Sequence, residues 1–345
     1  MTPLNGRERP PRAAANVAQH RIGRRADRAA AFQSASRRSA GERKAAAQSS
    51  PTKTRRAFLQ ALLAAAGCSQ VSLLGASISS QSDPSAPGGG LIDVNVNLAR
   101  WPLRHLRGDD TPALAAMLRR HRVVQAWAGS FDGLLHKDLA SVNARLAEEC
   151  RRHGRGLLVP IGSINPKAPE FQEELRRCAE VHGMPGIRLH PNYHSYHLDD
   201  PNFARLLRLA TERRLLVQLA LVMEDERMMH PLLRVEPVDV APLAEVVKQT
   251  PDLRLVLLNA LRTLRGQSLT DLLAAGDVSV EISMLEGVGA VANLLAQVPP
   301  GRVLFGSHAP LFYFESARLK LQESPLDQGQ LQAICRGNAR RVLGR

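Results

Sequence analysis

Short apolar runs alternate with longer amphipathic segments from residue 91 to residue 345, and this alternation constrains the fold more than any other feature. Runs rich in Val, Leu and Ile predict parallel strands, and the segments between them predict helices that cover a sheet. The predicted strands are eight: 91–96, 123–128, 156–161, 186–189, 215–221, 253–258, 278–282 and 302–305. Eight strands with helices between them favour an α/β fold of the closed (β/α)8 TIM-barrel type over an open doubly wound sheet.

The composition divides the chain into four parts. Residues 1–53 form a basic leader with few large apolar side chains, and that composition predicts disorder. Residues 54–80 form a candidate export signal, and residues 81–90, rich in Ser, Pro and Gly, form the expected linker. Residues 91–345 form the expected TIM barrel, with a length close to the roughly 250 residues typical of that fold. We therefore expect residues 1–80 to be dispensable for folding.

The candidate export signal opens with Thr54-Arg55-Arg56-Ala57-Phe58-Leu59. Paired arginines before a mildly apolar segment resemble a twin-arginine signal, which predicts an exported, periplasmic or extracytoplasmic protein. Polar residues interrupt the apolar segment, so it falls short of the roughly 20 apolar residues that span a bilayer. Two alternatives stay open: the arginine pair occurs by chance in an Arg-rich tail, or Cys68 carries a lipid anchor. Membrane contact is expected only through the signal or that anchor.

The formal charge of +14 lies mostly at the front of the chain. Residues 1–56 hold 14 of the 46 lysines and arginines and 3 of the 32 acidic residues, so residues 57–345 carry only +3. A nucleic-acid-binding domain needs a basic surface on its folded body, often with aromatic residues that stack on bases. Aromatic residues make up 4% of this chain. We therefore expect no nucleic-acid partner.

The four cysteines, Cys68, Cys150, Cys178 and Cys335, form no CxxC pair and no zinc-ligand spacing. Buried free thiols are favoured over a disulfide for Cys150 and Cys178, although the sequence leaves both open. No GxGxxG, GxxxxGK[ST] or GxSxG motif is present. The chain therefore has no dinucleotide-binding, P-loop or serine-hydrolase signature.

Four motifs, in order along residues 91–345, resemble the amidohydrolase-related family. The first strand contains Ile92-Asp93-Val94-Asn95-Val96-Asn97, with the spacing of the family's Ile-Asp-x-His-x-His. Gly186-Ile187-Arg188-Leu189-His190-Pro191 is similar to a later strand end, and Gly306-Ser307-His308-Ala309-Pro310 is similar to the family's Gly-Ser-Asp-x-Pro. Gly337-Asn338-Ala339-Arg340-Arg341 resembles its closing helix. The resemblance implies a TIM barrel with its site at the carboxyl ends of the strands.

In that family, histidines and an aspartate at these strand ends hold a divalent metal that activates water. The resemblance implies that this chain has replaced most of those ligands, at Asn95, Asn97, Ala220, Asn259 and His308. Neutral amide oxygens are poor ligands for zinc. We therefore assign no residue as a metal ligand. Zinc or manganese remains a cofactor only by family resemblance.

The candidate catalytic residues are His190 and His308, because imidazoles titrate near neutral pH and both follow a predicted strand. The alternative is that each is an ordinary polar group at a strand end. The candidate substrate-binding residues share a place at a strand end or in a following loop: Asn95, Asn97, Arg188, Asn259, Glu281, His136 and Tyr193. Glu281 lies inside a strand, so burial requires either an arginine partner or a role in the site. For Arg188, we expect either an anionic substrate or a carboxylate partner.

The resemblance implies a hydrolase that acts on a small polar substrate of the lactone, amide or carboxylate type, with a degenerate metal site. Decarboxylation, which some relatives carry out, is also open. The alternative is a non-catalytic TIM barrel that binds a small polar ligand, because three amides at strand ends need hydrogen-bond partners. In each case the expected partner is a small molecule.

Overall fold

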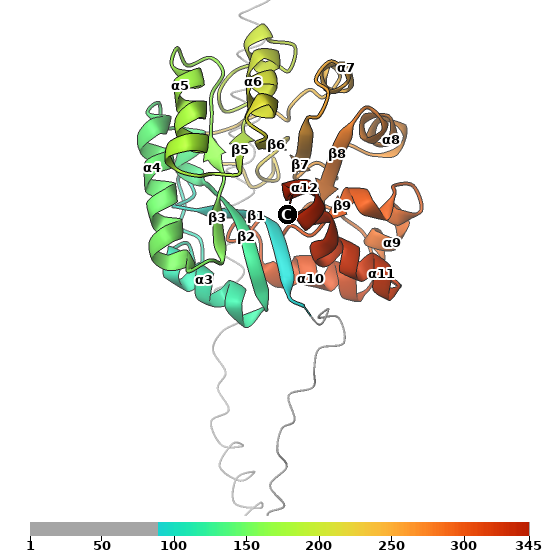
Figure 1. Cartoon of the computed structure of the whole chain (residues 1–345). Helices are drawn as coiled ribbons and strands as arrows, with labels where there is room; N and C mark the ends of the chain where they lie inside the picture. Colours follow the sequence, from blue (N-terminus) through green and yellow to red (C-terminus); the bar gives the residue numbers. More distant parts are fainter. Residues whose placement is uncertain (1–88, 345) are drawn as a thin grey trace, which may run out of the picture. The chain divides into compact units, whose positions relative to one another are not determined.

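The computed structural model describes residues 89–344. Its strands are β1 Leu91–Leu98, β2 Val123–Ser130, β3 Leu158–Pro160, β4 Gly162–Ser163, β5 Gly186–Leu189, β6 Leu216–Ala220, β7 Arg254–Leu258, β8 Asp277–Glu281 and β9 Val303–Leu304. Its α-helices are α3 Thr111–Arg120, α4 Leu139–Glu149, α5 Phe171–Arg176, α6 Pro201–Glu212, α7 Leu243–Lys248, α8 Gly266–Ala274, α9 Ala290–Leu295, α10 Phe314–Gln322, α11 Gln328–Gln332 and α12 Asn338–Leu343. The helices surround the strands (Figure 1). The predictions for residues 1–80 and for Cys68 lie outside the described residues, and of the linker only Gly89 and Gly90 are described.

The strands are all parallel and form two sheets, β1-β2-β3 and β4-β5-β6-β7-β8-β9. β3 and β4 are two halves of one strand separated by Ile161, whose N–H donates to Ala128 O at 2.9 Å. The other ends of the sheets meet where Val94 N–H donates to Phe305 O at 3.0 Å and His308 N–H donates to Asn95 O at 2.8 Å. The predicted eight-stranded TIM barrel is therefore confirmed.

The third strand begins later than the sequence predicts. The expected range was 156–161, whereas β3 starts at Leu158. Gly156 has φ +79 and Arg155 has φ +46, and this left-handed backbone cannot continue a strand. The turn before the strand therefore takes two residues from the predicted element.

Helices α3 and α6 begin where the sequence predicts a helix start, directly after Asp110 and Asp200. The Asp110 side chain accepts from Ala113 N at 2.8 Å, and the Asp200 side chain accepts from Asn202 N at 2.8 Å. In α6 the residues at positions i, i+3, i+4 and i+7 are buried against the barrel: Phe203, Leu206, Leu207 and Ala210. Burying a large apolar side chain stabilises the fold by about 1.5–3 kcal/mol. The caps and this apolar stripe explain why these segments form helices.

Helix α12 lies across the amino-terminal end of the barrel. Its Val342 and Leu343 pack in one apolar cluster with Leu216 and Val256. Arg254 Nη1 also donates to Val342 O at 3.0 Å. The helix closes this end, so the carboxyl ends of the strands carry the open face and its loops.

The three cysteines among residues 89–344 are free and buried: Cys150, Cys178 and Cys335. Burial raises the pKa of the Cys150 and Cys335 thiols to about 12. The favoured prediction of buried free thiols is therefore confirmed for Cys150 and Cys178, and the structure adds Cys335. Within the same residues, none of the helices has the length and apolar character that crossing a membrane requires.

Candidate functional site

Seven of the nine predicted site residues converge at the carboxyl ends of the strands. Each has an exposed fraction of at most 1%: Asn95 and Asn97 in β1, Arg188 in β5, His190 directly after it, Asn259 after β7, Glu281 at the end of β8, and His308 after β9. The other two lie apart: His136 is exposed, and Tyr193 is half-buried against the apolar cluster at the barrel mouth.

The first group joins β1, β7 and β8. Asn95 Nδ2 donates to Asn259 Oδ1 at 2.8 Å and to Glu281 Oε1 at 3.2 Å. Glu281 Oε1 also accepts from Asn259 N at 2.6 Å and from Ser283 Oγ at 2.8 Å. Gly306 leaves room for this carboxylate, because a Cβ there would collide with Glu281. Of the two expectations for Glu281, an arginine partner is absent from the described contacts, and neutral donors bind its carboxylate instead.

The second group joins β1, β5 and the end of β9. Arg188 Nη1 donates to Asn97 Oδ1 at 2.7 Å, and Asn97 Nδ2 lies 3.3 Å from His308 Nδ1. Because the Asn97 amide nitrogen is a donor only, His308 Nδ1 must accept this bond. His308 Nε2, 2.8 Å from Met223 O, must then carry the ring proton. Both ring nitrogens of His308 are therefore engaged and the ring is neutral.

Arg188 is a buried cation held by neutral oxygens. Besides Asn97, it donates to Gln218 Oε1 at 2.8 Å, Val96 O at 3.0 Å and Trp127 O at 3.1 Å. Burial lowers its pKa to about 9, while the nearby carboxylates of Asp93 and Glu281 oppose that change. No carboxylate among the described residues takes part in these bonds. The guanidinium instead links four strands of the barrel.

Gly129, at the end of β2, makes space for this guanidinium. A Cβ at that position would lie 2.6 Å from Arg188 Nη1. Such a contact is too short for a carbon and a nitrogen that are not bonded. The sequence therefore keeps an open place for the arginine beside β2.

The two histidines have depressed basicity. Burial lowers the pKa of His308 to about 4, although its bond to Met223 O opposes the change. Burial also lowers the pKa of His190 well below the usual value, with smaller contributions from His194, Arg188 and His308. His190 Nδ1 has no hydrogen-bond partner among the described residues. Both imidazoles are therefore neutral at pH 7, and His190 retains an unused ring nitrogen.

Asn259 and His308 both have left-handed backbone, with φ of +57 and +58. This conformation costs a residue other than glycine about 1–3 kcal/mol, and such strain gathers at functional positions. At both positions the chain leaves a strand and turns its side chain toward the barrel axis.

Asp93, Ser307, Ser283 and Gln218 belong to the same polar interior, and sequence reasoning did not select them. Asp93 Oδ2 accepts from Ser307 Oγ at 2.5 Å, and Asp93 Oδ1 accepts from Ser307 N at 3.0 Å. Burial raises the Asp93 pKa to about 7, opposed by these bonds. Two signals were available. Asp93 and Ser283 lie two positions from a selected residue, on the same side of an extended chain, and Gln218 is the one polar residue in β6.

Apolar side chains cover this polar interior. Trp101, Phe131, Leu134 and Met223 are each at most 4% exposed and belong to one cluster. The Trp101 and Phe131 rings meet edge to face, with centroids 5.0 Å apart. A ligand reaches the strand ends only if part of this cover moves.

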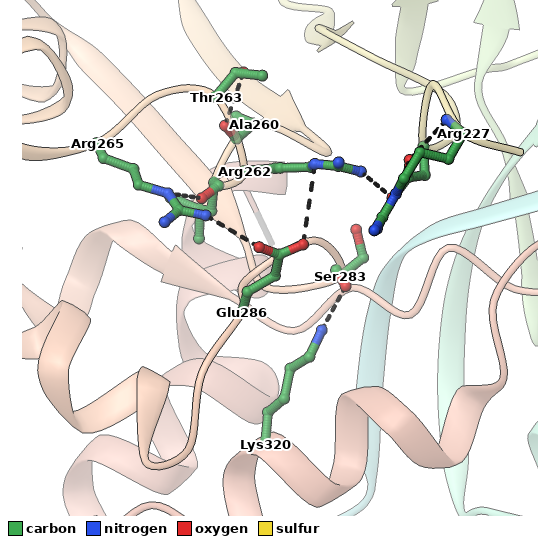
Figure 2. A network of polar contacts seen from close by, with 10 residues as sticks. Arg227, Ala260, Arg262, Thr263, Arg265, Ser283, Glu286 and Lys320 are labelled. Atoms are coloured by element: carbon green, nitrogen blue, oxygen red, sulfur yellow. Dashed lines mark hydrogen bonds and ion pairs between the residues drawn. The ribbon is translucent and has the colours of Figure 1, made fainter. Parts of the chain in front are cut away.

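Ion pairs hold the loop after β6, which carries Met223, to its neighbours. Glu224 pairs with Arg104 at 2.9 Å, and Asp225 pairs with Arg262 at 2.6 Å. Arg262 also pairs with Glu286, and Figure 2 shows Glu286 between Arg262 and Arg265. The loops after β6, β7 and β8 are thus tied together over the barrel mouth.

The family follows from a match over most of the chain. The family described as amidohydrolase matches residues 92–345, and these residues include every strand of the barrel apart from Leu91 at the start of β1. The chain belongs to the amidohydrolase family. No curated protein matches this member of the family.

Solved structures share the fold of this amidohydrolase family member at low identity. A 5-carboxyvanillate decarboxylase from Sphingomonas paucimobilis is 14% identical with a TM-score of 0.56, over 74% of this chain and 99% of its own. A putative amidohydrolase from Staphylococcus aureus is 12% identical with a TM-score of 0.56, over 74% and 100%. A dihydroxybenzoic acid decarboxylase from Polaromonas sp. JS666, solved with manganese and 2-nitroresorcinol, is 13% identical with a TM-score of 0.55, over 74% and 97%.

The strand-end residues of this family member do not fit a divalent metal. Asn95 and Asn97 turn their amide nitrogens toward other side chains, and His308 has no free ring nitrogen. Zinc is bound through carboxylate, imidazole or thiolate donors with free lone pairs, and an amide nitrogen offers none. Among residues 89–344, no group of three or more His, Cys, Asp or Glu side chains is placed to hold such an ion. The buried charge of Arg188 would also repel a cation.

Proposed function

We propose that this amidohydrolase family member binds a small polar ligand at its strand ends and does not carry out metal-dependent hydrolysis. The observation that carries the proposal is the state of His308, which stands where the family has its proton-accepting aspartate. Both of its ring nitrogens are engaged, to Asn97 and to Met223 O. A base needs a free lone pair to take a proton from water. His308 has none.

Two buried polar atoms support a binding role. Asn95 Oδ1 and His190 Nδ1 have no hydrogen-bond partner among the described residues. A buried polar group without a partner costs about 1–3 kcal/mol, and a ligand that bonds to it removes that cost. A small molecule with hydroxyl or amide groups would meet this requirement.

The second candidate function is hydrolysis or decarboxylation of a small lactone, amide or carboxylate. His190 favours it, because an imidazole with an unused nitrogen can still transfer a proton once its surroundings change. The decarboxylases of the same fold also act on small aromatic carboxylates, according to their names.

Calorimetry and NMR on one panel of small lactones, amides and hydroxybenzoates test the two functions. We expect binding without turnover, with or without added manganese. His190→Ala should weaken binding, whereas His136→Ala, at an exposed position, should not. Product formation that His190→Ala abolishes would favour the second candidate and reject the first.

The metal site is predicted to be recoverable by substitution. Changing Asn95→His, Asn97→His and His308→Asp together should raise affinity for zinc or manganese by at least about 100-fold, because three strong donors would converge at the strand ends. The unchanged protein should bind either ion weakly. Calorimetric titration of both proteins decides this, and tight binding by the unchanged protein would show that we have misjudged its ligand set.

We propose export by the twin-arginine route, and Arg55-Arg56 before the mildly apolar segment supports it. With residues 1–90 fused to a reporter, changing both arginines to lysine should leave the reporter in the cytoplasm. Reporter exported as before would contradict the proposal. Lipid attachment at Cys68 is a separate proposal, and Cys68→Ala should then release the exported protein from membranes.

A further inference from the structure

A groove of about 780 Å³ lies beside the barrel mouth, between the loop after β1, helix α3 and the loop after β9. Small-ligand sites commonly have volumes of about 300–1,000 Å³. Its apolar lining includes Leu106, Leu114, Met117, Phe312 and Phe314. None of the seven buried strand-end residues lines it, so the groove is distinct from the candidate site.

Three arginines line the same groove: Arg104, Arg107 and Arg120. Arg104 is committed to Glu224. Arg107 and Arg120 are exposed and have no ion-pair partner among residues 89–344. Two unpaired cations therefore border an apolar surface.

The two carboxylates that line the groove have other partners. Asp110 caps α3 by accepting from Ala113 N, and Glu315 lies 3.1 Å from His121 Nε2. Neither carboxylate is in an ion pair with Arg107 or Arg120 in the structure. Both carboxylates keep their negative charge, but neither lies against Arg107 or Arg120, so the two guanidinium groups stay open to a ligand.

We propose that this groove binds a small organic anion with an apolar body, such as an aromatic carboxylate. Its carboxylate would meet Arg107 or Arg120, whose planar guanidinium groups suit carboxylate oxygens. Its ring would lie on Leu106, Met117 and Phe312, burying apolar area on both partners. An apolar neutral molecule would lose the first contact, and inorganic anions would lose the second.

The groove also adjoins the strand-end site. The ring of Phe312 packs edge-on against His308, with centroids 5.2 Å apart. A ligand on Phe312 is therefore one side chain away from the polar interior. The proposal does not depend on the function of that interior, because no strand-end residue contributes to the groove.

Titration calorimetry of the full chain tests the proposal with 2-naphthoate and its neutral counterpart, 2-naphthylmethanol. We expect saturable binding of 2-naphthoate about tenfold tighter than binding of the alcohol, since exposed ion pairs contribute only modestly to affinity. Changing Arg107→Gln and Arg120→Gln together should remove that difference. Arg208→Gln, at an exposed arginine on α6, is the matched control and should keep it.

A second variant tests the apolar part. Ala113→Trp places a large ring in the groove while both arginines stay, and it should abolish naphthoate binding with the melting temperature retained. His190→Ala should leave naphthoate binding unchanged, which separates this proposal from the function proposed above. Three results would each overturn the proposal. They are equal affinity for the acid and the alcohol, equal effects of the double variant and Arg208→Gln, and absence of binding at millimolar naphthoate.

Discussion

Replacing Arg188 by methionine should lower the free energy of unfolding by about 3–5 kcal/mol, because four acceptors on three other strands lose their buried donor. The oxygens affected belong to Asn97, Val96, Trp127 and Gln218. Methionine fills a similar length but donates no hydrogen bond. Urea unfolding followed by the fluorescence of Trp101 and Trp127 measures the loss.

Two further substitutions serve as comparisons for Arg188→Met. Arg188→Lys keeps the charge but has no planar fork, so it should recover only part of the stability. Arg208→Met, on the exposed face of α6, should change stability by less than about 0.5 kcal/mol. If Arg188→Met unfolded at the same urea concentration as Arg208→Met, the guanidinium would not be holding the strands together.

His308 should make the fold sensitive to acid. Its pKa is about 4 in the folded protein against the ordinary histidine value of 6.5, so between these pH values the unfolded chain binds a proton that the folded chain does not. Its contribution is fully present above pH 6.5 and is lost as the pH falls toward 4. The loss amounts to about 3 kcal/mol for a fully buried group. His308→Gln should remove this loss.

Asp93 acts in the opposite direction. Because its folded pKa is raised to about 7, the stability it contributes is present below pH 4 and is lost as the pH rises to 7. The free energy of unfolding of each variant is therefore compared with that of the unchanged protein at pH 7 and at pH 4.5. Both proteins retain Asp93, so its contribution cancels in this difference. His136→Gln, at an exposed position, is the control. If His308→Gln lost as much free energy of unfolding between pH 7 and pH 4.5 as the unchanged protein does, His308 would not titrate as inferred.

The barrel was predictable from sequence because its signals are local. Val, Leu and Ile runs mark the strands, and Asp110 and Asp200 mark helix starts before proline. The start of β3 was not predictable to the residue. The helical segment Cys150–Gly154 ends in a left-handed turn at Arg155 and Gly156, and the apolar run of residues 156–161 does not show where that turn ends.

The sequence predicts where most of the site residues lie, but not which hydrogen bonds join them. Family spacing placed Asn95 and Asn259 at the strand ends, the predicted strand placed Glu281 beside them, and the structure joins the three through hydrogen bonds. The partners of Arg188 could not be foreseen, because backbone oxygens of Val96 and Trp127 supply two of them and carry no sequence signal. His136 and Tyr193 sit on loops, whose course depends on tertiary contacts.

The bond between Ser307 and Asp93 joins residues 214 positions apart, across the closure of the barrel. A growing chain cannot make this contact until almost all of it has left the ribosome, so the first strand waits with an unpaired edge during most of synthesis. The order of events in the cell is thus imposed by topology: β1 can pair with β2 early, and its other edge is paired only after β9 and the residues that follow it have been synthesised.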